Sequence, residues 1–110
     1  MGAEAIDPEV ALDALADRNR RSILRLIRSG PLPVGAIAEQ TGLSQQTASH
    51  HLGVLRKAGL AVSTKDGTRH LFAVNVDGLA AVRSYLDDFW PSKLAALKAA
   101  VEAGEGANRG

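Results

Sequence analysis

The chain has 110 residues, 45% of them hydrophobic, so we expect a single small domain whose limited core would gain stability from dimerisation. It has no cysteine, which excludes disulfides, thiolate metal sites and thiol redox switches. An acidic start and the lack of an apolar run of about 18 residues argue against a signal peptide and a membrane span, so we expect a soluble, cytoplasmic protein.

Charge is distributed unevenly along the chain, although the formal net charge is only +1. Residues 18–70 carry nine basic and two acidic side chains, a formal charge of +7. The remainder carries four basic and ten acidic side chains, a formal charge of −6. A basic middle between acidic ends predicts a polyanionic partner for the middle. The alternative is that these arginines only decorate a solvated helical surface.

Two helices are predicted near the start of the chain, after a disordered stretch over residues 1–7. Asp7 offers a capping oxygen and is followed by proline, which suits the first helical position, so a helix is expected over residues 8–16. Asp17 can cap a second helix over residues 18–28, which a Ser-Gly-Pro stretch then ends.

A helix-turn-helix unit is predicted next. The third helix has an apolar face that begins at Val34. Ala38 and Gly42 have the spacing of a small residue that lets two helices touch and a glycine that turns the chain. Ser44 is then placed to cap a fourth helix over residues 45–58.

A β-hairpin is predicted after this unit. Two β-prone segments, residues 60–64 and 69–75, flank a Lys-Asp-Gly-Thr turn, and Asp-Gly between such segments is a strong hairpin signal. A helix-turn-helix followed by such a wing presents one helix to a DNA major groove and one basic loop to the flanking backbone or minor groove.

The last part of the chain predicts an amphipathic helix with a wide apolar stripe. Asp77 is expected to cap this helix, and Pro91 is expected to kink it or break it in two. The DNA-binding and dimerisation domain is therefore expected to span residues 8–103, with a flexible tail over residues 104–110.

Several of these motifs together have a counterpart in a known family. Residues 43–60 resemble the recognition helix of ArsR-type (ArsR/SmtB-like) winged-helix repressors. Residues 17–24 are similar to the second-helix signature of that family, and residues 67–70 to its wing tip. The ending Leu-Asp-Asp-Phe-Trp at residues 86–90 resembles a cysteine-free branch, and the similarity extends over residues 12–90.

The resemblance implies a mainly α winged helix-turn-helix with a small β-hairpin, dimerising through its first and last helices. It implies a homodimer that binds an inverted-repeat operator in double-stranded DNA, most often as a repressor of its own operon. Many members sense metals through cysteines on the third helix or Asp, His and Glu on the last. This sequence has no soft-metal ligand between Val34 and Gln40 and no histidine after His70, so we expect no metal and no cofactor.

The fourth helix divides into two faces when its residues are spaced at about 100°. Ala48, Leu52 and Leu55 cluster on one side, and polar residues such as Gln46 and His50 lie opposite. Glutamine can pair with adenine, serine and histidine can also bond base edges, and basic wing residues can contact phosphate or the minor groove. The candidate DNA-binding residues are Ser44, Gln45, Gln46, Thr47, Ser49, His50, Lys57, Lys65, Arg69, Arg20 and Arg21.

Each candidate also has a plainer interpretation, since solvent alone selects a polar outer helix face. Gly53 leaves the outer face without a side chain, which permits close approach of the backbone. His51 lies at the edge of the inward face, so we expect it mainly to pack within the fold, with a phosphate contact as its second role. Arg20 and Arg21 are as well explained as solvated surface arginines, and His70 as a wing surface residue rather than a ligand.

The apolar residues of the first and last helices predict an isologous dimer seam, because aromatic residues are enriched in buried interfaces. The break at Pro91 would let the end of the chain wrap around the partner. The alternative is that these side chains only fill the core of the monomer. The candidate interface residues are Leu12, Leu15, Leu79, Val82, Tyr85, Leu86, Phe89, Trp90, Leu94 and Leu97.

Three classes of function remain open at this stage, with a homodimeric DNA-binding repressor as the leading hypothesis. The first alternative is a sensor repressor that takes a small ligand or metal at its dimer interface. The second is a protein-interaction module that has lost DNA binding. An enzyme is not expected, because no paired carboxylates, glycine-rich phosphate loop or oriented nucleophile can be identified.

Overall fold

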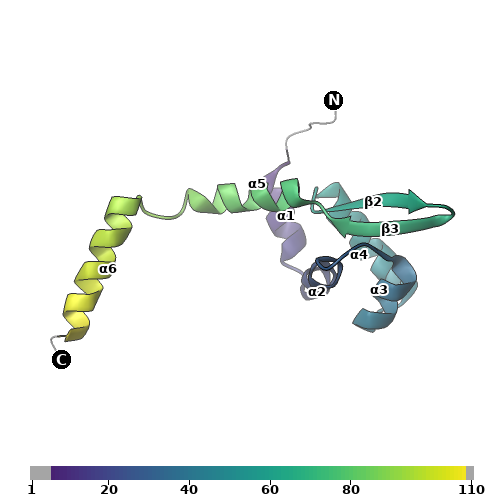
Figure 1. Ribbon diagram of the computed structural model, residues 1–110, viewed down its shortest axis with the longest axis horizontal. Coiled ribbons are helices and arrows are strands. Elements are labelled where there is room, and N and C mark those ends of the chain that lie inside the picture. Colours follow the sequence, from purple (N-terminus) through teal and green to yellow (C-terminus); the bar gives the residue numbers. More distant parts are fainter. Residues whose placement is uncertain (1–5, 109–110) are drawn as a thin grey trace.

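The computed structural model describes residues 6–108, with the backbone alone for residues 95, 96 and 105–108. Figure 1 shows the elements in chain order. They are α1 (Pro8–Leu15), α2 (Arg18–Ile27), β1 (Leu32–Pro33), α3 (Val34–Thr41), α4 (Gln45–Lys57), β2 (Ala61–Asp66), β3 (Arg69–Val74), α5 (Val76–Asp87) and α6 (Lys93–Asn108). The disorder predicted for residues 1–7 falls mostly on residues 1–5, which lie outside the described residues.

The first two helices begin at the caps that the sequence predicts. The Asp7 carboxylate accepts the backbone N–H of Glu9 at 3.0 Å, and proline occupies the start of α1. The Asp17 carboxylate accepts the backbone N–H groups of Asn19 at 2.8 Å and Arg20 at 3.2 Å. Both caps satisfy donors that have no partner within the helix, which is why the helices begin at these residues.

The cap at Asp17 predicts an acid-dependent part of the stability. The backbone N–H of Arg20, and then that of Asn19, lower the pKa of Asp17 below its ordinary value of 3.8, with a further contribution from the Arg20 charge. Because the pKa is lower in the folded state, this stabilisation is complete above about pH 4 and is lost as the pH falls through the folded-state pKa.

Asp17→Asn keeps a capping acceptor but removes the titration. We therefore expect its free energy of unfolding to fall less steeply than that of the wild type below about pH 4, measured by urea unfolding at a series of pH values. Parallel curves for the two proteins over that range would show that Asp17 does not contribute.

The helix-turn-helix is formed by α3 and α4 as predicted. Gly42 ends α3 in the left-handed conformation, with φ of 76°, and Ala38 is buried where the helices meet. Ser44 caps α4 by accepting the backbone N–H of Thr47 at 3.0 Å. A glycine is needed at this turn because other residues rarely adopt a positive φ.

The core lies among α1, α2, α3, α4, the base of the hairpin and Val82 of α5. Its largest fully buried side chains are Ile23, Ile27, Ile37, Leu52, Leu55 and Leu60. Burial of each such side chain stabilises the fold by about 1.5–3 kcal/mol. The core therefore fixes α4 from its inner face and leaves its outer face to solvent.

The sheet differs in two ways from the predicted hairpin. It has three antiparallel strands in the order β1-β3-β2, because the short β1 pairs with β3 through Leu32↔Phe72. The turn has only two residues, since Asp66 and Arg69 already pair in the ladder and Gly67 takes a φ of 67°. The prediction of a simple hairpin missed β1, since two residues show no alternation and the pairing is not local.

The start of α5 corrects another prediction. Asp77 does not cap this helix, which begins one residue earlier, at Val76. Asn75 precedes it, and its side chain does not cap the helix either. The Asn75 Nδ2 instead donates to the carbonyl oxygen of Gly59 at 2.8 Å, which ties the start of α5 to the turn after α4.

Pro91 separates two helices rather than kinking one. α5 ends at Asp87, and the next three backbone N–H groups bond three residues back, as in a tight final turn. Proline lacks an N–H and disfavours a helical residue before it, so the helix cannot continue across the link. The segment predicted as a flexible tail from residue 104 is helical through Asn108, since α6 continues to that residue, and residues 109–110 lie outside the described part.

The molecule is extended, with principal dimensions of 63 × 37 × 21 Å. Figure 1 shows the wing at one end of the long axis and α6 at the other, joined to the body by α5. Residues 94, 97 and 101 of α6 are all more than half exposed. None of the described helices is long and apolar enough to cross a membrane.

Candidate nucleic-acid interface

The outer face of α4 is the centre of the candidate interface. Ala48, Leu52 and Leu55 are at most 1% exposed, so the predicted inward face is confirmed. The polar residues predicted on the opposite face are exposed, namely Gln46, Ser49, His50 and Lys57. α4 therefore presents amide, hydroxyl and imidazole groups that match the hydrogen-bonding groups of base edges.

The first turn of α4 is organised by its own side chains. The Ser44 Oγ accepts the backbone N–H of Thr47 and donates to the Thr47 Oγ1 at 2.9 Å. The Gln45 amide nitrogen lies close to Gly35 at the start of α3, so this side chain lies against the other helix of the unit. Ser44, Gln45 and Thr47 are all exposed. They surround the N-terminus of α4, and a helix N-terminus favours binding of a phosphate group.

A groove of about 490 Å³ runs between the end of α4 and strand β2. It is lined by Gly53, Arg56, Lys57, Ala61, Val62 and Ser63. Arg56 was not among the predicted residues. The sequence did contain its signal, because Arg56 follows Ser49 by seven residues and so lies on the same helix face.

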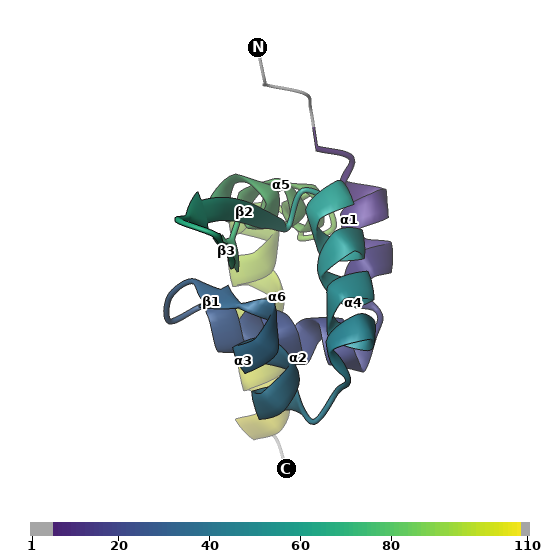
Figure 2. The ribbon, with the colours of Figure 1, turned by 90° about the vertical axis from the view of Figure 1, so that its right-hand side faces the viewer.

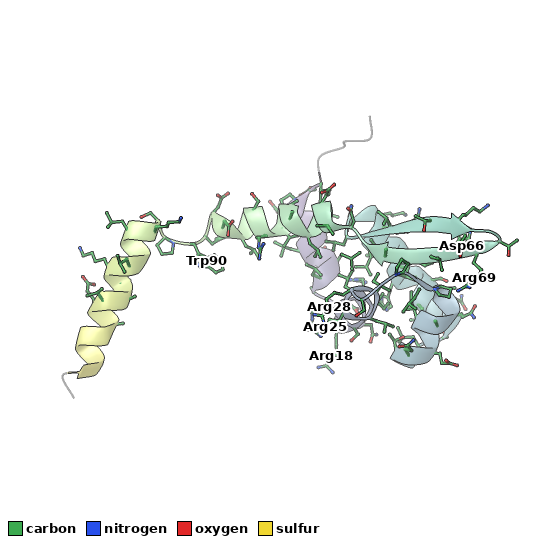
Figure 3. All side chains as sticks on the ribbon, in the orientation of Figure 1. Arg18, Arg25, Arg28, Asp66, Arg69 and Trp90 are labelled. Carbon is green, nitrogen blue, oxygen red and sulfur yellow. The ribbon has the colours of Figure 1, made fainter. Side chains whose placement is uncertain are left out.

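The wing carries the second group of candidates. Lys65 and Arg69 are exposed on β2 and β3, next to the two-residue turn. Figure 3 shows Arg69 and its ladder partner Asp66 near the far end of the hairpin. Figure 2 looks onto this end of the molecule, where the wing, α3 and α4 lie toward the viewer and α6 lies behind. α4 and the wing thus share one side of the molecule.

Arg20 has a role within the chain that the sequence prediction did not include. Its Nε donates to the carbonyl oxygen of Ala14 at 2.6 Å, and its NH1 lies 3.4 Å from the Nδ1 of His51. His51 is only 8% exposed, which confirms its structural assignment. Because arginine can only donate, the Nδ1 of His51 acts as the acceptor in this contact.

Arg21 is engaged in a similar way. Its NH1 donates to the carbonyl oxygens of Leu15 at 2.8 Å and Ala16 at 3.0 Å. Arg20 and Arg21 therefore satisfy the free carbonyl groups at the end of α1. The angle between α1 and α2 determines these contacts, and no local sequence pattern predicts it.

The other arginines of α2 point away from the wing. Figure 3 shows Arg18, Arg25 and Arg28 on the side of α2 that lies below α5 and toward α6. The positive charge of the middle of the chain is therefore divided between two surfaces. The basic residues on the side of α4 and the wing are Arg56, Lys57, Lys65 and Arg69.

The predicted dimer residues fall into two classes. Leu12 and Leu15 pack against the core, and Val82 is only 6% exposed within the monomer, so Val82 belongs to the core rather than to an open seam. Tyr85 is half-buried and contacts Phe89 edge to face, with ring centroids 5.4 Å apart. The exposed class contains Leu79, Leu86, Phe89, Trp90, Leu94 and Leu97.

Within the described part of the chain, no three His, Cys, Asp or Glu side chains are grouped so that they could hold a metal ion. His70 is exposed on the wing strand. His50 and His51 have ring centroids 5.7 Å apart, and one ring is exposed while the other is buried. The polar groups of this surface are thus spread along α4 and the hairpin, and in the described residues they do not converge on one position as metal ligands do.

Comparison with known proteins agrees with this geometry. A family model described as a helix-turn-helix domain matches residues 15–64. The chain is 41% identical over 87 residues to the HTH-type transcriptional regulator Rv2034 of Mycobacterium tuberculosis, which covers 79% of this chain and 81% of that protein. A homodimeric winged helix-turn-helix DNA-binding domain from Mycobacterium bovis, described as a possible ArsR-family regulator, is 30% identical with a TM-score of 0.58, covering 83% of this chain and 94% of that one. The chain belongs to the ArsR family.

This result confirms the family and the winged helix-turn-helix fold that the motifs predicted. A further relative is the arsenical resistance operon repressor of Staphylococcus xylosus, 33% identical over 76 residues, which covers 69% of this chain and 73% of that protein. As an ArsR-family member, the chain is a DNA-binding transcriptional regulator and not an enzyme.

Proposed function

We propose that this ArsR-family protein is a homodimeric, cytoplasmic repressor that binds an inverted-repeat operator, including one upstream of its own gene. The observation that supports the proposal most directly is the position of α4 relative to the wing. α4 and the wing lie on the same side of the molecule (Figure 2), and the polar residues of α4 and the basic residues at the wing tip are exposed. α4 would read base edges in the major groove, and the wing would hold the flanking phosphates.

The apolar residues at the opposite end support the dimer. α5 and α6 expose Leu86, Phe89, Trp90, Leu94 and Leu97, each by more than a third. A two-fold dimer through this end would leave both recognition helices free and place them in successive major grooves, about 34 Å apart. The homodimeric relative from Mycobacterium bovis and the repressor from Staphylococcus xylosus are in accord with this assembly and this role.

Fluorescence anisotropy with two duplexes tests the proposal. One duplex carries the DNA upstream of the gene for this protein, and the other carries the same bases in scrambled order. We expect tight binding to the first alone, with one dimer per site, and weak, salt-sensitive binding to the second. Equal binding to both duplexes would contradict autoregulation, and no binding to either would contradict the DNA-binding role.

Replacing Arg69 by glutamine should weaken binding to the operator and to the scrambled duplex by the same factor. The reason is that Arg69 at the wing tip is expected to contact phosphate rather than a base. The slope of log K against log salt should become shallower by about 1. Arg83→Gln is the matched control, since it removes the same charge from α5 at a distance from the wing. A loss confined to the operator duplex would instead assign Arg69 to base recognition.

A further inference from the structure

A second groove lies between α2 and the start of α5. Its apolar floor is formed by Leu15, Leu24, Val74 and Leu79, and Arg25 and Arg28 stand exposed at its edge. We refer to it as the arginine-rimmed groove. Its volume is about 270 Å³.

The link between α5 and α6 has the complementary chemistry. Residues 87–90 read Asp-Asp-Phe-Trp, and all four are exposed. Phe89 and Trp90 are 68% and 67% exposed, which is unusual for two adjacent large aromatic side chains. Figure 3 shows Trp90 projecting from the link on the same side as the α2 arginines project from the body. We refer to residues 87–90 as the acidic-aromatic link.

A continuous helix holds the link away from the groove of its own chain. Leu79 at the groove lies in the first turn of α5, and Asp88 in the link follows its last residue, so nine residues of continuous helix, about 14 Å, separate them. A second copy does not have this restriction. If two α5 helices pack antiparallel about a two-fold axis, the end of each helix lies beside the start of the other, where Val74 and Leu79 line the groove.

We propose that the acidic-aromatic link of one copy docks in the arginine-rimmed groove of a second copy, twice in each dimer. The aromatic side chains occupy the apolar floor, and Asp87 and Asp88 pair with Arg25 and Arg28 at the edge. Arginine beside an aromatic ring adds a cation–π attraction. This proposal rests on the homodimer proposed above, and it assigns to Arg25 and Arg28 a partner other than DNA.

Reversed charges test this docking without disturbing the core, because all four charged side chains are exposed. One variant carries Arg25→Glu with Arg28→Glu, and the other carries Asp87→Lys with Asp88→Lys. In a homodimer of either variant, the link and the edge of the groove carry charges of the same sign. The dimer dissociation constant of each variant should therefore rise by at least about tenfold in analytical ultracentrifugation. An equal mixture should restore the wild-type constant, because in the heterodimer both links meet grooves of opposite charge. Arg56→Glu with Lys57→Glu is the matched control, which should leave dimerisation unchanged.

Trp90 provides an independent measurement, since it is the single tryptophan of the chain. Its emission should shift to shorter wavelength with protein concentration, in parallel with dimer formation, as the ring leaves water. A wild-type dimer whose Trp90 emission stays constant, or a mixture that dimerises no better than its components, would overturn the docking while the homodimer stands. A wild type that stays monomeric at all concentrations would overturn both proposals.

Discussion

Gly78→Ala is expected to lower the free energy of unfolding by about 3 kcal/mol, at the upper end of the cost of overpacking. Gly78 lies in the first turn of α5 and packs directly on the turn after α4. A β-carbon at this position would overlap the carbonyl oxygen of Gly59 and lie 2.7 Å from its carbonyl carbon. These are backbone atoms, and the same oxygen accepts the Asn75 side chain at 2.8 Å, so neither side can move without breaking another contact.

Thermal unfolding followed by circular dichroism measures this effect. A loss of this size corresponds to a melting temperature lower by more than roughly 10 °C in a domain of this length. Gly53→Ala is the matched control, because this glycine lies in α4 with no atom within 4 Å of an added β-carbon. That change should stabilise the helix by up to about 1 kcal/mol. Equal melting temperatures for the two variants would show that the contact between Gly78 and Gly59 relaxes freely.

His50→Ala and Gln46→Ala are each expected to weaken operator binding by about 1–3 kcal/mol, or roughly 5-fold to 150-fold. Both side chains lie on the exposed face of α4, where they would bond base edges. A lost base contact should reduce affinity for the operator without reducing affinity for a scrambled duplex. Competition experiments with operators changed at single positions should show a relaxed preference at the contacted base pair.

Two controls separate base reading from stability. Gln40→Ala makes the same chemical change at an exposed position near the end of α3 and should leave operator affinity unchanged. His51→Ala removes a buried ring beside Arg20, so it should lower the melting temperature, whereas His50→Ala should not. Unchanged operator affinity for His50→Ala would mean that α4 is rotated differently in the DNA groove.

The sequence predicted the elements whose signals are local. Asp7, Asp17, Ser44 and Gly42 mark helix ends by their own side chains or backbone freedom, and the structure confirms all four. The two faces of α4 were also predictable, since helical periodicity alone separates Leu52 and Leu55 from the polar residues. These features need no knowledge of how the helices pack.

The features that the sequence did not predict depend on distant contacts. Strand β1 exists because Leu32 pairs with Phe72, forty residues later. Asn75 bonds Gly59 instead of capping α5, because the turn after α4 lies beside it. The count of charges assigned a polyanionic partner to residues 18–70 as a whole, but the direction of each α2 arginine depends on the orientation of the whole helix. The residues proposed to contact DNA and a partner remain predictions.

The guanidinium group of Arg20 joins two parts of the molecule with different tasks. It binds the end of α1 through Ala14 and the inner side of α4 through His51. α1 packs against α5 on the proposed dimer side, and α4 faces the proposed DNA side. A rotation of α1 relative to α4 would therefore stretch both contacts of one side chain. In a dimer, the spacing between the two reading helices, and so the length of operator that fits them, would be maintained by an arginine that itself contacts no base.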